Sequence, residues 1–312
     1  MNPRRVVWFA AIAGLGYLAI AVWLVSSDVI EIPPVSGFAL LLVALAAVSQ
    51  IAAKWFFGLL FRESVQAAGG DLRPWLAFKA ALVGAGIARL IPAGGAITPA
   101  GMSWTVRDEV DAGSAGPAVR TVLLNYAGLL IMTGVGLIVA PFDFTFLQIG
   151  MTVLGVIVLV IGAVLMFGSG KLETLSRYLP RFIRNQVKDA VIDHLPGWES
   201  QLYIWARLAL EAGALWLVLT GFGIDLGGFE VLAAFGASQL AGGLPGPPGG
   251  VVVVEGTLGF ILIAYGVPAT AAVAPVLMFR VISYWLPSAL GLLAGGSTFL
   301  GSDAAKGAES SA

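Results

Sequence analysis

The chain has 312 residues, of which 58% are hydrophobic and only 11% are charged, and its mean hydropathy is +0.93. Soluble domains carry about 25% charged residues, so this composition predicts an integral membrane protein. The net charge of −1 argues against a nucleic-acid partner, which needs a basic face. The absence of cysteine and the single histidine, His194, argue against thiol catalysis and against a metal site.

The first apolar run covers about 6–25 and follows Arg4 and Arg5. It is too long for the apolar core of a signal peptide, and no small-residue cleavage pattern follows it, so it predicts an uncleaved spanning helix. Five further runs approach the ~20 residues that cross a bilayer core. They cover 36–61, 117–140, 145–168, 202–222 and 269–298. The last run is interrupted by Pro275 and Pro287, and forms either one broken helix or two shorter pieces.

Two other apolar stretches, 75–104 and 229–265, are each split by a Pro/Gly cluster into halves too short to span comfortably. Non-helical backbone at membrane depth persists only where protein or a wet cavity satisfies its polar groups. We therefore predict an all-α membrane protein with about six spanning helices and two re-entrant hairpins of broken helices, eight hydrophobic segments in all. The predicted breakers are Pro92, Gly94, Gly95, Pro245, Gly249 and Gly250 in the hairpins and Pro287 in the last run.

Basic residues predict the orientation of the chain. With the N-terminus and the C-terminus in the cytoplasm, all but three of the 17 Lys and Arg fall on the cytoplasmic side. The loops on the outside contain none, and lie near 27–36, 141–144, 223–229 and 266–268. The first hairpin then enters from the cytoplasm and the second from outside.

Opposite entry of the two hairpins is typical of an inverted repeat with broken helices near the midplane. Pro92 precedes a helix with Arg120 and Tyr126, as Pro245 precedes a helix with Arg280 and Tyr284. Ordinary loops between short helices are the alternative interpretation.

We expect 1–300 to form a single polytopic membrane domain, with its one substantial polar connection at 169–199. There, apolar residues recur near helical spacing among basic ones, which is typical of an amphipathic helix on the cytoplasmic leaflet. A positively charged loop that only orients the chain explains the same pattern. The Ser/Ala-rich tail, 301–312, is predicted to be disordered.

Three basic side chains fall inside apolar runs, where an ionisable group is costly unless it is paired or wetted. Lys54 follows Gln50 by one helical turn and either lines a cavity or extends toward the membrane surface. Arg89 precedes the first breaker, where it would bind a lipid phosphate or the carbonyl groups freed by the break. Arg280 lies in the last run, with Tyr284 on the same helical face.

Two acidic residues inside apolar runs have identifiable partners. Glu211 stands one turn after Arg207, which favours an intrahelical ion pair. Glu255 lies in the half-helix after the second breaker, 25 residues before Arg280. Buried opposite charges on adjacent elements tend to pair, so Glu255 and Arg280 form either a structural bridge or a pair that also binds or gates a substrate.

Three stretches carry a resemblance to a known family: Gly243–Gly256 (GLPGPPGGVVVVEG), Tyr265–Pro268 (YGVP) and Phe279–Pro287 (FRVISYWLP). Together they resemble the signature of the lysylphosphatidylglycerol synthase transmembrane-region family, described as flippase-like membrane proteins. Pro247-Pro248 departs from the usual glycine-rich breaker, and the first hairpin lacks the acidic residue often found soon after the break. The resemblance places these residues at the characteristic positions: Pro245, Gly249, Gly250, Glu255, Gly256, Arg280, Tyr284 and Pro287.

The resemblance implies translocation of a lipid or lipid-linked intermediate across a bacterial plasma membrane. Because the chain stops soon after its last helix, the soluble synthase domain is expected to be missing. The substrate would be a membrane lipid or a polyprenyl-linked compound that meets Glu255, Arg280, Tyr284, Arg89 or Lys54. No nucleotide-binding pattern or acid–base constellation occurs, so we expect no cofactor, no metal and no enzymatic activity. The alternatives are an ion-coupled transporter of a small solute and an accessory scaffold for an envelope-building enzyme.

Overall fold

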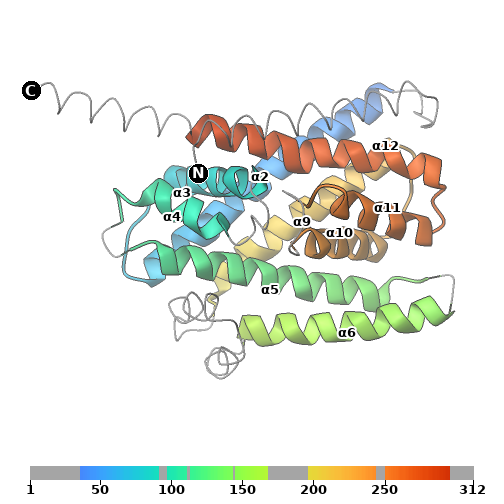
Figure 1. Ribbon diagram of the computed structural model, residues 1–312, viewed down its shortest axis with the longest axis horizontal. Coiled ribbons are helices and arrows are strands. Elements are labelled where there is room, and N and C mark those ends of the chain that lie inside the picture. Colours follow the sequence, from blue (N-terminus) through green and yellow to red (C-terminus); the bar gives the residue numbers. More distant parts are fainter. Residues whose placement is uncertain are drawn as a thin grey trace, which may run out of the picture.

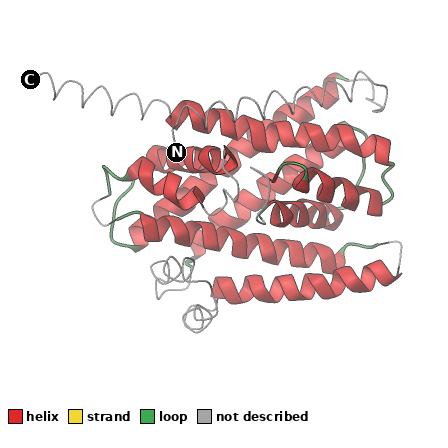
Figure 2. Cartoon of the chain, in the orientation of Figure 1, coloured by secondary structure: helices red, strands yellow, loops and turns green. Residues whose placement is uncertain are grey.

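The computed structural model describes residues 36–90, 97–110, 113–142, 145–167, 196–243 and 250–295. Within these ranges the chain is helical and no strand occurs (Figure 2). Five helices are long and apolar enough to span a bilayer, which confirms the all-α membrane class. They are α2 (Gly37–Ala67), α5 (Ala115–Val139), α6 (Thr145–Phe167), α9 (Trp198–Gly221) and the helix over Ala269–Gly295. The predicted first span, the tail and most of the polar connection lie outside the described residues.

The last predicted run is one continuous helix, and the prediction of Pro287 as a breaker is wrong. The helix comprises α12 (Ala269–Arg280), a π-helical turn, η3 (Val281–Trp285), and a further α-helical stretch up to Gly295. In η3 the Leu286 N–H donates to the Val281 carbonyl, five residues back. Proline has no N–H to bond the preceding turn. The π turn, whose hydrogen bonds join residues five positions apart, lies just before Pro287.

Helix α2 extends past its predicted end at residue 61 because the two charged residues that follow are both bonded. The Arg62 Nε–H donates to the Leu72 carbonyl at 2.8 Å, and Glu63 accepts from Arg120 at 2.9 Å. A count of apolar residues ends the span before these two charges, but charged residues that are paired can lie within a membrane helix.

The first predicted hairpin consists of α3 (Pro74–Leu90) and α4 (Thr98–Val106), which pack against each other. Its two outer ends lie together, since Arg73 forms an ion pair with Glu109 and Leu72 shares an apolar cluster with Val110. The hairpin therefore returns to the end of the bundle where it begins (Figure 1).

The second predicted hairpin consists of α10 (Gly228–Gly242) and α11 (Val253–Ala264), and its outer ends also meet. Tyr265 stacks on Phe142 of the α5–α6 connection at a centroid distance of 4.8 Å. Burial raises the pKa of the Tyr265 phenol, and the charge of Glu230 in the first turn of α10 raises it further. Figure 1 shows this hairpin at the opposite end from α3–α4, which is the placement that an inverted repeat requires.

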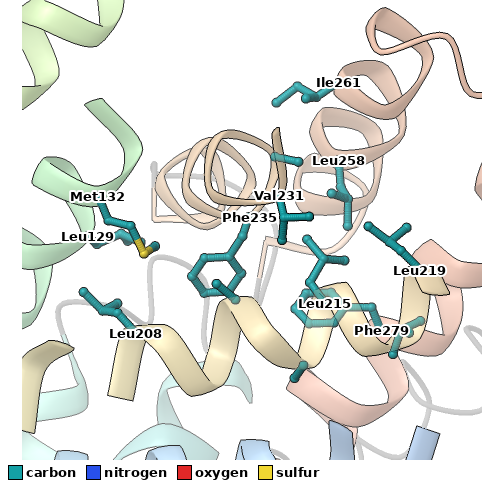
Figure 3. Close-up of a cluster of buried hydrophobic side chains, with 14 of the residues drawn as sticks. Leu129, Met132, Leu208, Leu215, Leu219, Val231, Phe235, Leu258, Ile261 and Phe279 are labelled. Atoms are coloured by element: carbon teal, nitrogen blue, oxygen red, sulfur yellow. The ribbon is translucent and has the colours of Figure 1, made fainter. Parts of the chain in front are cut away.

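Helices α2 and α9 run antiparallel at the centre and make the most extensive contact in the described bundle. Lys54 meets Glu211, while Phe57, one turn later on α2, meets Arg207, one turn earlier on α9. An adjoining face of α9 carries the main apolar core, where Leu208, Leu215 and Leu219 pack with α5, α10, α11 and α12 (Figure 3).

Each hairpin packs closely against a long helix of the other half of the chain: α3 against the helix over Ala269–Gly295, called the closing helix below, and α10 against α5. A Cβ atom added at Gly291 would lie 2.2 Å from the Leu82 carbonyl oxygen of α3 and 3.2 Å from the Gly86 Cα. A Cβ atom added at Gly136 of α5 would lie 2.5 Å from the Ala233 nitrogen of α10. Small residues at such contacts let helix backbones approach each other inside a membrane.

Replacing Gly291 by alanine is expected to lower the free energy of unfolding by about 1–3 kcal/mol, because the new methyl group meets backbone that cannot rotate away. The matched control is Gly213→Ala in α9, where nothing lies within 4 Å of the added carbon. That variant should gain up to about 1 kcal/mol from helix propensity. Unfolding in detergent measures both, and equal stability of the two variants would contradict the close packing.

The predicted orientation is testable because the native chain has no cysteine. Asp225→Cys lies in the α9–α10 connection, and Arg107→Cys lies just after α4. We expect a membrane-impermeant maleimide to label the cysteine at 225 in intact cells and the cysteine at 107 only after permeabilisation. The reverse pattern would invert the proposed topology.

Candidate functional site

The two leading candidates, Glu255 and Arg280, form an ion pair inside the bundle. Arg280 Nε donates to Glu255 Oε1 at 2.8 Å, and the side chains are 5% and 15% exposed respectively. The Arg280 guanidinium also lies over the ring of Tyr284, 4.5 Å from its centroid. The contact joins the second hairpin to the closing helix through three residues that the sequence analysis singled out.

Local backbone structure positions both members of this pair. Glu255 lies in the first turn of α11. This helix begins directly after Val252, whose φ of 74° is rare for a β-branched residue. Arg280 is the last residue of α12 before the π turn. Left-handed backbone and π turns both concentrate at functional sites, and here they flank the same ion pair from two sides.

The Glu255 carboxylate is only partly satisfied. Oε1 accepts the bond from Arg280, whereas Oε2 is buried without a hydrogen-bond partner. A buried carboxylate oxygen without a donor is costly. The carboxylate can therefore accept one more hydrogen bond, for example from a group of a bound ligand.

A second buried cluster lies at the contact between α2 and α9. Lys54 Nζ donates to Glu211 Oε1 at 2.6 Å, and Arg207 Nη2 donates to the same oxygen at 3.1 Å. The Arg207–Glu211 pair confirms the intrahelical contact expected from the sequence. Lys54, for which a cavity-lining position was one prediction, bonds Glu211 across the helix interface, and all three side chains are at least 90% buried.

The sequence analysis missed a third network, at the contact between α2 and α5. Arg120 Nη1 donates to Glu63 Oε2 at 2.9 Å and to Ser64 Oγ at 3.2 Å, and Thr121 also bonds Ser64. Arg120 was compared with Arg280 on the basis of the repeat, and both prove to be buried and paired with glutamate. Glu63 lies on α2 and not after the first breaker, so a search limited to the hairpin does not find it.

The sequence matches the family model described as the lysylphosphatidylglycerol synthase TM region over residues 6–291. The chain belongs to this family. Two proteins named "UPF0104 membrane protein", both from Methanothermobacter thermautotrophicus (strain Delta H), are each 32% identical to it, over 84 and 85 residues. Each match covers 27% of this chain and 25% of the relative, so the matched stretch spans about a quarter of the curated relatives' length.

Most other predicted site residues of this lysylphosphatidylglycerol synthase TM-region protein lie at the edges of the described ranges or outside them. Gly250, with a φ of 64°, begins the described backbone after the second breaker. Arg89 lies in the last turn of α3, and its side chain is outside the described residues. The same holds for most breaker residues, namely Pro92, Gly94, Gly95, Pro245 and Gly249. Among the described residues, no cluster of His, Asp and Glu side chains is arranged to hold a metal ion.

Proposed function

We propose that this protein moves a lipid or lipid-linked intermediate with an anionic head group between the two leaflets of the membrane. The observation that carries the proposal is the buried Glu255–Arg280 pair, with its unsatisfied carboxylate oxygen, at the contact between the second hairpin and the closing helix. Buried ion pairs contribute little net stability compared with apolar side chains of similar volume. A pair inside an apolar bundle therefore favours a role beyond folding.

The proposed action of the pair follows from its chemistry. A phosphate or carboxylate head group that reaches Arg280 competes with Glu255 for the guanidinium, because both are oxyanion acceptors. Binding of the head group then loosens the contact between α11 and α12. The two hairpins at opposite ends supply a similar broken element for each leaflet.

A proteoliposome assay tests the proposal. Vesicles with purified protein carry phosphatidylglycerol, or a polyprenyl phosphate, with a fluorophore on the hydrophobic chain, and an external reductant quenches the outer leaflet. We expect the wild type to expose the inner-leaflet pool to quenching, and Arg280→Ala to slow this by at least tenfold. The matched control is Arg73→Ala, which removes an exposed arginine from a surface pair. Wild-type vesicles that behave like protein-free vesicles would contradict the proposal.

The same vesicles separate the two alternatives. An ion-coupled solute transporter would accumulate a water-soluble head-group analogue under a proton gradient, with Glu255 Oε2 as the proton site. An accessory scaffold would transport neither compound, and its cellular function would survive neutralisation of both Glu255 and Arg280.

A further inference from the structure

Arg207 is buried at the contact between α2 and α9 with most of its hydrogen-bonding capacity unused. Only 9% of the residue is exposed, and both Nε and Nη1 are buried without a hydrogen-bond partner. Its hydrogen bond to Glu211 runs from Nη2 to Oε1, the oxygen that also accepts a bond from Lys54. The ring of Phe57 covers one face of the guanidinium at 4.5 Å. Two of the three nitrogens are therefore left to donate within the plane of the group.

Among the buried arginines of the described ranges, only Arg207 has buried nitrogens without a hydrogen-bond partner. Arg120 bonds a carboxylate and a hydroxyl through Nη1, and Arg280 donates through Nε to Glu255. Neither has a buried nitrogen without a partner, whereas Arg207 has two. Unsatisfied donors on a buried cation are costly and rare in native structures, which indicates that an acceptor occupies this position in the working protein.

The surroundings of Arg207 connect it to the second hairpin. A Cβ atom added at Gly128 of α5 would lie 3.0 Å from Leu208, the residue after Arg207, and one added at Gly243, at the inner end of α10, would lie 3.2 Å from the hydroxyl of Tyr126 on α5. The position is therefore bordered by α2, α5 and α9 and lies close to the break in the hairpin. It shares no residue with the Glu255–Arg280 pair.

We propose that Arg207 binds a phosphate group of a ligand through Nε and Nη1, as an anion site separate from Glu255 and Arg280. Guanidinium groups bind phosphate through parallel hydrogen bonds, and they do so most strongly where water is excluded. The source of the phosphate is either the head group of a lipid or free inorganic phosphate. Assignment to a transported lipid rests on the proposed function, whereas phosphate binding at Arg207 does not.

The structure offers a variant that removes the anion site and keeps the fold. Arg207→Met leaves the 2.6 Å Lys54–Glu211 pair intact and removes the two unsatisfied donors. We expect this variant to unfold at or above the wild-type temperature when no anion is present. The matched control is Arg107→Met, which removes an arginine that is half exposed at the end of α4. Should Arg207→Met fail to fold, Arg207→Gln, with an uncharged hydrogen-bonding side chain as long as methionine, serves for the same measurement.

Thermal unfolding in an uncharged detergent reports binding, with three probes added separately: inorganic phosphate, dioctanoyl phosphatidic acid and dioctanoylglycerol. We expect phosphatidic acid to raise the melting temperature of the wild type and of Arg107→Met by several degrees. Arg207→Met should show a clearly smaller rise, since only the Arg280 site of the proposed function remains, and dioctanoylglycerol should have no effect on any variant. A rise with inorganic phosphate as well identifies a site for the phosphate alone, and a rise only with phosphatidic acid identifies a site for the lipid.

Two results would overturn the assignment: no rise for the wild type with either phosphate probe, or an equal rise for Arg207→Met. Translocation is scored separately in the vesicle assay. A wild type that binds phosphate through Arg207 but moves no lipid contradicts only the proposed function. A wild type that moves lipid while Arg207→Met binds phosphate equally well contradicts only the anion site.

Discussion

Replacing Arg280 by alanine is expected to lower the free energy of unfolding by about 3–5 kcal/mol, the usual cost of breaking a buried ion pair. The loss is large because Glu255 Oε2 already lacks a hydrogen-bond partner, and the variant also removes the arginine that donates to Oε1. Glu255→Gln should show a smaller loss, since the amide oxygen can still accept from Arg280. The control Arg73→Ala, at an exposed pair, should change stability by less than about 1 kcal/mol.

The charge-swapped variant, Glu255→Arg with Arg280→Glu, separates the two roles of the pair. A purely structural bridge regains both stability and translocation. A pair in which Arg280 binds the head group regains stability alone, because a carboxylate then stands where the anionic head group should bind. Single variants with the melting temperature and the translocation rate of the wild type would show that the pair has neither role.

A comparable loss, about 3–5 kcal/mol, is expected for Glu211→Gln, because it removes the charge that Lys54 and Arg207 share. Arg207→Met should show no loss, since the Lys54–Glu211 contact remains and two unsatisfied donors are removed. The triple variant Lys54→Met, Arg207→Met and Glu211→Leu replaces the cluster by apolar side chains and should recover most of the stability. Chemical unfolding in detergent gives the ranking, and a Glu211→Gln variant as stable as Arg207→Met would refute it.

Much of the fold could be predicted from the sequence because bilayer thickness fixes the length of a spanning helix. The described spans begin and end within a few residues of the predicted runs, apart from the end of α2. The Glu255–Arg280 pair was also predictable, because each residue is the isolated charge of its segment and a short connection joins the two helices.

The charged contacts between helices distant in sequence were not predictable, because they depend on how those helices align. Lys54 and Glu211 are 157 positions apart, and they meet only because α2 and α9 lie antiparallel in one register. Glu63 and Arg120 are 57 positions apart, and they meet across the contact between α2 and α5. The predicted apolar run ends at residue 61, before Glu63, and only the packed structure shows that the helix continues through this residue.

The π turn at Val281–Trp285 gives the closing helix a way to turn Arg280 without breaking. A π turn holds one residue more than an α turn. When the π turn moves along the helix, each residue that it passes rotates by about 100° around the helix axis, while the segments on either side keep their relative orientation and nearly all backbone hydrogen bonds are kept. Since Arg280 directly precedes the turn and Gly291 lies beyond it, movement of the turn past Arg280 toward the N-terminus would swing the guanidinium away from Glu255 while the contact with α3 stays in place.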